Sequence, residues 1–228
     1  LMPYLLDNRM APLTWSWGFL ESQLEQVCAA NRAWSQQSEL PFTEEAVSGS
    51  LEETLCCLTP LTVLSRQELL LETAAGWTAS FNNGLYGGND IGSMVGVLSE
   101  DMQCRGVMVT AKPVYSNVVY GGDVGFTLHN KSMDYERMLR VHNDGHWSFH
   151  TYGNLQPFEQ EVNYKARRVR DRFTTDMLGT YCEALGIRLF DLAFYGLKGT
   201  LFTQHIKMPP DFPCMSLEEA QRQLGSPR

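Results

Sequence analysis

The chain has 228 residues, of which 43% are hydrophobic and 19% are charged, so it is long enough to bury one sizeable core or two small ones. Its 18 Lys and Arg residues stand against 26 Asp and Glu residues, and the net charge of −8 argues against nucleic acid as a partner. No apolar run approaches the roughly 18 residues of a membrane helix, and residues 1–9 lack the charged-then-apolar order of a signal peptide, so we expect a cytoplasmic protein without membrane contact.

Helices are expected near the start of the chain. Apolar side chains at spacings of three and four predict an amphipathic helix over residues 14–34, with Thr14 as its N-cap. The polar stretch 35–50 is interpreted as a loop. Ser50 and Glu53 then have the order of a capping box, so a short helix is expected to follow them.

From about residue 66 the pattern changes to that of antiparallel strands. Asn143-Asp144-Gly145 lies between two alternating runs and is the strongest hairpin signal in the chain, because such turns tolerate positive φ angles. A glycine-rich loop over residues 82–92 is expected to lead into a helix whose left-handed cap is Gly106. Runs rich in β-branched and aromatic residues predict the strands 68–72, 77–81, 107–112, 124–128, 137–142 and 146–151.

The last quarter of the chain is expected to return to helix, first after Thr174 and then after a capping box at Ser216. The fold class that we predict is α+β, with an antiparallel sheet of five or six strands packed against helices and an N-terminal helical portion. We expect a single domain over residues 1–228. The alternative is a helical portion over residues 1–65 followed by an α+β domain over residues 66–228.

His142, His146 and His150 recur every four residues, and the first two flank the predicted turn. His142 and His146 could approach each other across the hairpin and share a metal ion. On a strand, however, His146 and His150 would lie roughly 13 Å apart, and no third ligand is placed near them. We therefore predict solvent-facing or partner-facing histidines and no metal site.

The glycine-rich loop lies between a strand and a helix N-terminus, which is where nucleotide-binding folds hold phosphate. Its residues do not follow the Gly-x-Gly-x-x-Gly or Gly-Lys-Ser/Thr order, and Asp90 would repel a phosphate, so a helix-capping role for Asp90 is favoured. No motif places a serine nucleophile or a pair of catalytic carboxylates. We therefore predict no catalytic residue and no cofactor.

A basic cluster in this acidic chain centres on Arg167, Arg168 and Arg170. These side chains could bind an anion such as phosphate. The favoured alternative is a solvated helix face whose charges pair with Glu159 and Glu161.

Five short segments stand out together: Trp77-Thr-Ala-x-Phe81-Asn-Asn-Gly84, Cys104-Arg-Gly-Val107, Tyr181-Cys-x-Ala-Leu-Gly-Ile187, Phe190-Asp191 and Phe194-Tyr195-Gly196. They resemble small bacterial proteins that are associated with toxin–immunity gene neighbourhoods. The resemblance extends over roughly residues 66–196 and leaves residues 1–65 outside it. It implies a cytosolic immunity protein that binds one cognate toxin and blocks its active site.

We therefore expect a non-enzymatic protein that neutralises a bacterial toxin, and an acidic charge would favour its encounter with a basic one. Two alternatives stay open. One is a hydrolase or nuclease-like enzyme whose site lies at the hairpin of His142 and His146, and the other is a structural or adaptor component of a larger assembly. The candidate partner-binding residues are Asp90, Glu100, Asp101, His142, Asp144, His146 and Trp147.

Overall fold

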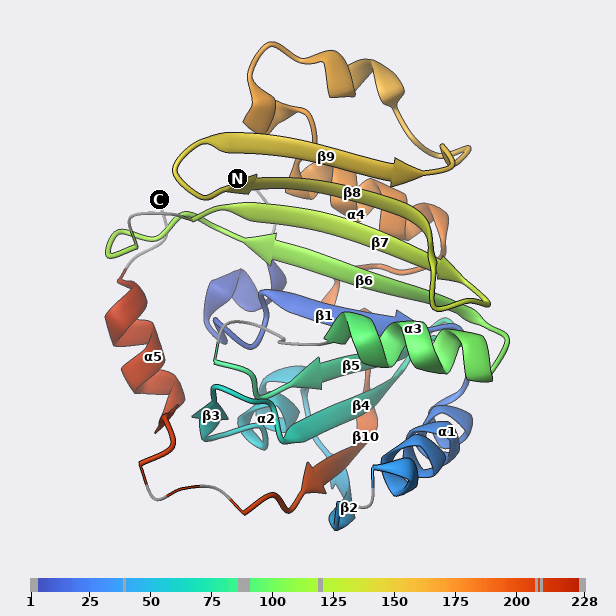
Figure 1. Ribbon diagram of the computed structural model, residues 1–228, viewed down its shortest axis with the longest axis vertical. Helices are drawn as coiled ribbons and strands as arrows, with labels where there is room; N and C mark the ends of the chain where they lie inside the picture. Colours follow the sequence, from blue (N-terminus) through green and yellow to red (C-terminus); the bar gives the residue numbers. More distant parts are fainter. Residues whose placement is uncertain are drawn as a thin grey trace.

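The computed structural model describes residues 4–38, 40–85, 91–118, 121–207, 209 and 211–225. Within them, a nine-stranded antiparallel sheet has the order β2-β10-β4-β5-β1-β6-β7-β8-β9, and β11 pairs with β3 in a second sheet (Figure 1). The strands are β1 (Ser16–Leu20), β2 (Phe42–Ser48), β3 (Leu61–Thr62), β4 (Gln67–Thr73), β5 (Thr78–Asn82), β6 (Arg105–Lys112), β7 (Asp123–Asn130), β8 (Tyr135–Asn143), β9 (Trp147–Gly153), β10 (Tyr195–Gln204) and β11 (Cys214–Met215).

Helices cover both faces of the large sheet. α1 and α3 lie on one face, where α3 packs on β1 and β6, whereas α4 packs on β7 from the other face (Figure 1). None of the described helices has the length and the apolar run that a membrane crossing requires. The α-helices are α1 (Leu24–Gln37), α2 (Leu51–Cys56), α3 (Ile91–Asp101), α4 (Thr175–Ala184) and α5 (Leu217–Leu224), and the 3-10 helices are η1 (Leu5–Asn8), η2 (Glu161–Lys165), η3 (Val169–Asp171) and η4 (Leu192–Phe194).

The central strand β1 supplies the middle of the core. Trp17 and Phe19 are fully buried on the face that α4 covers, and the Trp17 ring stacks on Phe81 with 6.2 Å between ring centroids. Trp17 Nε1 donates to the hydroxyl of Tyr195 at 3.1 Å, and that hydroxyl donates to the Leu189 carbonyl at 2.8 Å. The polar atoms of the Trp17 and Tyr195 rings are therefore paired, and these hydrogen bonds offset the cost of removing them from water.

Two predictions for the start of the chain are wrong. Ser16–Leu20 is the strand β1 rather than the first half of a helix, and α1 begins only at Leu24. β1 is buried on both faces, so it lacks the polar alternation of a half-buried strand, and the spacing of its apolar residues matches a helix by coincidence. The predicted loop over residues 35–50 contains β2, an edge strand with mostly polar side chains. β1 and β2 belong to the same sheet as the later strands.

The predicted sheet of five or six strands is also too small. No strand is predicted over residues 195–204, but β10 lies there and pairs with β2 and β4. Gly106, the predicted helix cap, lies within β6 instead. A Cβ at Gly106 would be 2.7 Å from a Val95 methyl group, so glycine allows α3 to lie directly on the sheet. The left-handed residue after α3 is Gln103, with φ of 52°.

Several other predictions that rest on turns and caps are confirmed. The hairpin predicted around Asn143-Asp144-Gly145 is β8-β9. The strands predicted over residues 68–72 and 77–81 pair as β4-β5, and those predicted over residues 107–112 and 124–128 pair as β6-β7. Capping boxes begin α2 at Ser50 and α5 at Ser216, and the Thr174 hydroxyl caps α4. These signals are local in the sequence, which is why they can be read without knowledge of the sheet order.

Candidate functional site

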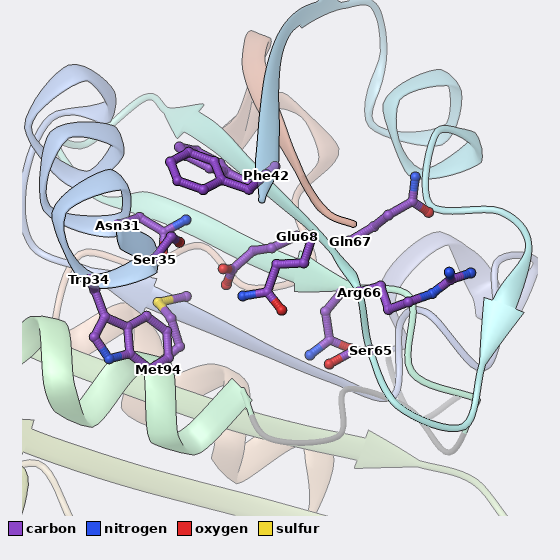
Figure 2. Close-up of a pocket in the computed structure, with 12 residues that line it drawn as sticks. Asn31, Trp34, Ser35, Phe42, Ser65, Arg66, Gln67, Glu68 and Met94 are labelled. Atoms are coloured by element: carbon purple, nitrogen blue, oxygen red, sulfur yellow. The ribbon is translucent and has the colours of Figure 1, made fainter. Parts of the chain in front are cut away.

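A cavity of about 150 Å³ lies between α1, α3 and the strands β2, β4, β5 and β10, and we call it the Glu68 pocket (Figure 2). α1 contributes Asn31 and Trp34, and β4 contributes Glu68. Further walls come from Phe42 of β2, Met94 of α3, and Phe202 and Gln204 of β10. The pocket therefore joins helices and strands that are far apart in the sequence.

Two local patterns turn polar side chains towards this pocket. Val27, Asn31 and Ser35 repeat every four residues along α1, so the helix presents polar groups on its buried side. On β4, Glu68 alternates with Leu69, which is fully buried in the core. Because successive side chains of a strand point to opposite faces, Glu68 points to the face that α1 covers.

The carboxyl group of Glu68 is held by two donors. The Ser80 hydroxyl donates to Glu68 Oε1 at 2.8 Å, and the side-chain amide of Asn31 donates to the same carboxyl group. Figure 2 shows Asn31 and Glu68 pointing towards each other. Burial raises the pKa of Glu68 to about 7, and the hydrogen bonds from Ser80 and Asn31 oppose this shift only in part. Glu68 can therefore take up or release a proton near neutral pH.

Asn31 carries a second, unusual feature. The residue is only 1% exposed, and in the part of the chain that the structure describes its Oδ1 atom has no hydrogen-bond partner. Leaving a buried acceptor unpaired costs about 1–3 kcal/mol, so such atoms commonly mark a place where a ligand or ordered water binds. The Glu68 pocket thus combines a proton-exchanging carboxyl group with an acceptor that a ligand could satisfy.

Among the predicted site residues, the structure brings together His142, Asp144 and His146. Asp144 lies between the two imidazoles, with one carboxylate oxygen 3.9 Å from His142 Nε2 and the other 3.7 Å from His146 Nδ1. Neither distance is that of a hydrogen bond. The His142 ring of β8 stacks on the His150 ring of β9, with 5.2 Å between ring centroids. Among the described residues, no group of three or more His, Cys, Asp and Glu side chains could hold a metal ion.

The remaining predicted partner-binding residues lie elsewhere. Trp147 is half-buried, and its ring lies against Gly122, where a Cβ atom would be only 2.6 Å away. Glu100 and Asp101 are exposed at the end of α3, close to the start of β6, whereas the β8-β9 hairpin lies near the end of β6. Asp90 lies outside the described residues. The structure therefore does not gather the seven predicted residues into one surface.

The basic cluster is exposed around η3. Arg167, Arg168 and Arg170 are all solvent-facing, and their binding of an anion stays a prediction. The alternative pairing with Glu159 is wrong, because Glu159 is buried and accepts two hydrogen bonds of 2.8 Å from Arg137. Burial and these direct contacts hold the Glu159 carboxylate in the core, away from the exposed cluster.

A second concave surface lies beside α3, and we call it the Tyr152 groove. Met133, Tyr135 and Tyr152 are each about half exposed or more, with exposed fractions of 51%, 48% and 60%. At its base, burial lowers the pKa of His129, so the ring is neutral and Nδ1 donates to the Ser132 carbonyl at 3.2 Å. His129 Nε2 is buried and, among the described residues, has no partner.

Sequence reasoning missed Asn31 and Glu68. Each residue has a signal in the sequence: Glu68 directly precedes the three leucines of β4, and Asn31 lies four residues after the buried Val27. Neither signal reveals that the two side chains meet. The chain matches no protein-family model, no curated protein and no solved structure.

Proposed function

We propose that this protein binds a small polar molecule in the Glu68 pocket. The observation that carries the proposal is the unpaired, buried Oδ1 atom of Asn31 beside the Glu68 carboxyl group. A cavity of about 150 Å³ has room for a benzene-sized molecule. A pocket with aromatic walls and a few convergent polar groups is the usual form of a small-molecule site.

A fragment screen by NMR tests this proposal. Protein with ¹⁵N-labelled tryptophan is mixed with cationic, neutral and anionic fragments, and the indole N–H resonance of Trp34 is followed. We expect at least one class of fragment to shift this resonance in a saturable way, and Glu68→Gln to weaken that binding. Glu72→Gln is the matched control, because it removes a carboxylate from the same strand outside the pocket. If no fragment shifts Trp34, or if both variants weaken binding equally, the proposal fails.

A second candidate function is the binding of a protein partner, as in an immunity protein that covers the active site of a toxin. The exposed aromatic and methionine side chains of the Tyr152 groove favour it, because such residues dominate the energy of protein interfaces. The net charge of −8 would speed the encounter with a basic toxin.

Rescue of bacterial growth tests this second candidate. Cells that express individual basic toxins are supplied with the wild-type chain or with the double variant Tyr135→Ser and Tyr152→Ser. We expect rescue from one toxin by the wild type and loss of rescue in the double variant, with the fold checked by circular dichroism. Rescue that the double variant retains, or an absence of rescue across the panel, would count against the groove as a toxin-binding surface.

A further inference from the structure

The Glu68 pocket holds two neighbouring acceptors, the Glu68 carboxyl group and Asn31 Oδ1. Arg66 Nε, a donor, is another buried atom of the lining that has no partner among the described residues. Asn31 donates an amide N–H to Glu68, and its Oδ1, which has no partner among the described residues, is free to accept from a ligand. An ionised carboxylate also offers only acceptor atoms. A ligand that satisfies both groups must therefore bring hydrogen-bond donors.

A ligand bound between these acceptors would also lie beside the charge of the Glu68 side chain. Of the described residues that line the pocket, only Glu68 and Arg66 have ionisable side chains. Figure 2 shows the Arg66 side chain extending away from Glu68, and Arg66 also lines a neighbouring cavity with His205 and Lys207. A ligand beside Glu68 is thus drawn to a negative charge when the carboxyl group is ionised.

Charged groups on the helices beside the pocket do not cancel the attraction of a cation to ionised Glu68. On α1, Arg32 is already paired with Glu44 of β2 through two hydrogen bonds of 2.6 and 2.7 Å. The thiol of Cys28, also on α1, has its pKa raised by burial and stays neutral. α3 contributes the uncharged Met94 to the wall. α1 and α3 therefore bring no unpaired cation to the pocket.

The walls suit a cation as well. Phe42 and Phe202 pack together with 6.3 Å between their ring centroids, and Trp34 stands on another side of the same cavity. The face of an aromatic ring attracts a nearby cation, most strongly when water is excluded. Aromatic rings beside a carboxylate are accordingly a common setting for bound ammonium groups.

We propose that the ligand of the Glu68 pocket is a small compound with a primary ammonium group, which donates to the Glu68 carboxylate and to Asn31 Oδ1. This inference rests on the proposed function, because it names the chemical class of ligand for the same pocket. An ammonium group has three N–H donors and one positive charge, which match the two acceptors and the negative charge described above. Because Glu68 must be ionised, binding should strengthen as the pH rises through about 7.

Three probes of similar size and different charge test the inference: butylammonium, butan-1-ol and butanoate. Each is titrated at pH 8 into protein with ¹⁵N-labelled tryptophan, and the Trp34 indole N–H resonance reports binding. We expect butylammonium to bind at least about tenfold more tightly than the other two probes, since a charge-assisted hydrogen bond replaces a neutral one. In Glu68→Gln the three affinities should agree within about twofold, whereas Glu72→Gln should keep the preference for butylammonium.

The pH dependence of the wild type gives a second test that needs no pocket variant. Butylammonium stays protonated across the range, so its affinity should fall about tenfold between pH 8 and pH 6 as Glu68 takes up a proton. His205→Gln should show the same fall, because His205 lines the neighbouring cavity and is not among the residues that line the Glu68 pocket.

Each outcome is decisive. If butan-1-ol or butanoate binds as tightly as butylammonium, or if none of the three probes shifts Trp34, the inference is overturned. Hits of another charge class in the fragment screen would then leave the proposed function standing. If the screen also finds no ligand, the proposed function falls with it.

Discussion

Replacing Glu68 with glutamine should remove a pH dependence of the free energy of unfolding. Burial raises the pKa of Glu68 from its ordinary value of 4.5 to about 7, so between these pH values the folded chain holds a proton that the unfolded chain has released. The stabilising contribution is fully present below pH 4.5 and is lost as the pH rises through about 7. One pKa unit corresponds to about 1.4 kcal/mol, so the loss across this range is about 3 kcal/mol.

Urea unfolding of the wild type and of Glu68→Gln at several pH values between 4 and 8 measures this contribution. Glutamine mimics the protonated carboxyl group, so the variant should lack the contribution of residue 68 while it keeps those of all other titrating groups. The difference in unfolding free energy between the two proteins should therefore change by about 3 kcal/mol, with the wild type losing stability relative to the variant as the pH rises. Parallel curves, or the same change in Glu72→Gln, would refute the reasoning.

Two further predictions concern the packing of the fold. Arg137→Ala leaves the Glu159 carboxylate buried without its partner, so this variant should lower the free energy of unfolding by about 3 kcal/mol or more, as measured by urea unfolding. Arg9→Ala, which breaks an exposed ion pair, is the control and should cost about 1 kcal/mol or less. Equal costs for the two variants would contradict this prediction. Gly106→Ala places a methyl group 2.7 Å from an α3 side chain, so it should lower the free energy of unfolding by about 1–3 kcal/mol, as measured by thermal unfolding. Gly121→Ala is the control and should cost less, because the nearest atom to its Cβ is 3.6 Å away. The reverse order would show that α3 can shift away from β6 at little cost.

The part of the fold that follows from local signals could be predicted from the sequence. The β8-β9 hairpin forms around Asn143-Asp144-Gly145 because Gly145 adopts a φ of 117°, and Ser50 and Ser216 cap their helices through neighbours three residues away. Such signals need no information about distant residues. Together with runs of β-branched and aromatic residues, they place six of the strands and the starts of several helices.

The strands that were missed depend on partners far along the chain. β1 lies between β5 and β6 and is apolar on both faces, so its sequence shows no period of two. β2 is an edge strand with polar side chains, and it becomes a strand by pairing with β10. β10 contains Gly199, where a Cβ atom would lie 2.4 Å from a Leu71 methyl group, so the glycine reflects contact with β4. These features are properties of the assembled sheet.

The Glu68 pocket also forms through contacts between residues that are far apart in the sequence, and the carboxyl group inside it lowers the stability of the fold. Its walls include Phe42 of β2 and Phe202 of β10, two strands that the sequence pattern does not reveal, and Asn31 reaches Glu68 only because α1 crosses this part of the sheet. Above pH 7 the buried carboxylate of Glu68 makes the protein about 3 kcal/mol less stable than an unperturbed carboxyl group would. Asn31 adds the cost of an unpaired acceptor. Functional sites are where proteins typically tolerate such costs, since a residue tuned for a ligand is rarely the most stabilising one. A cationic ligand would offset both costs at once, because it supplies a charge to Glu68 and a donor to Asn31.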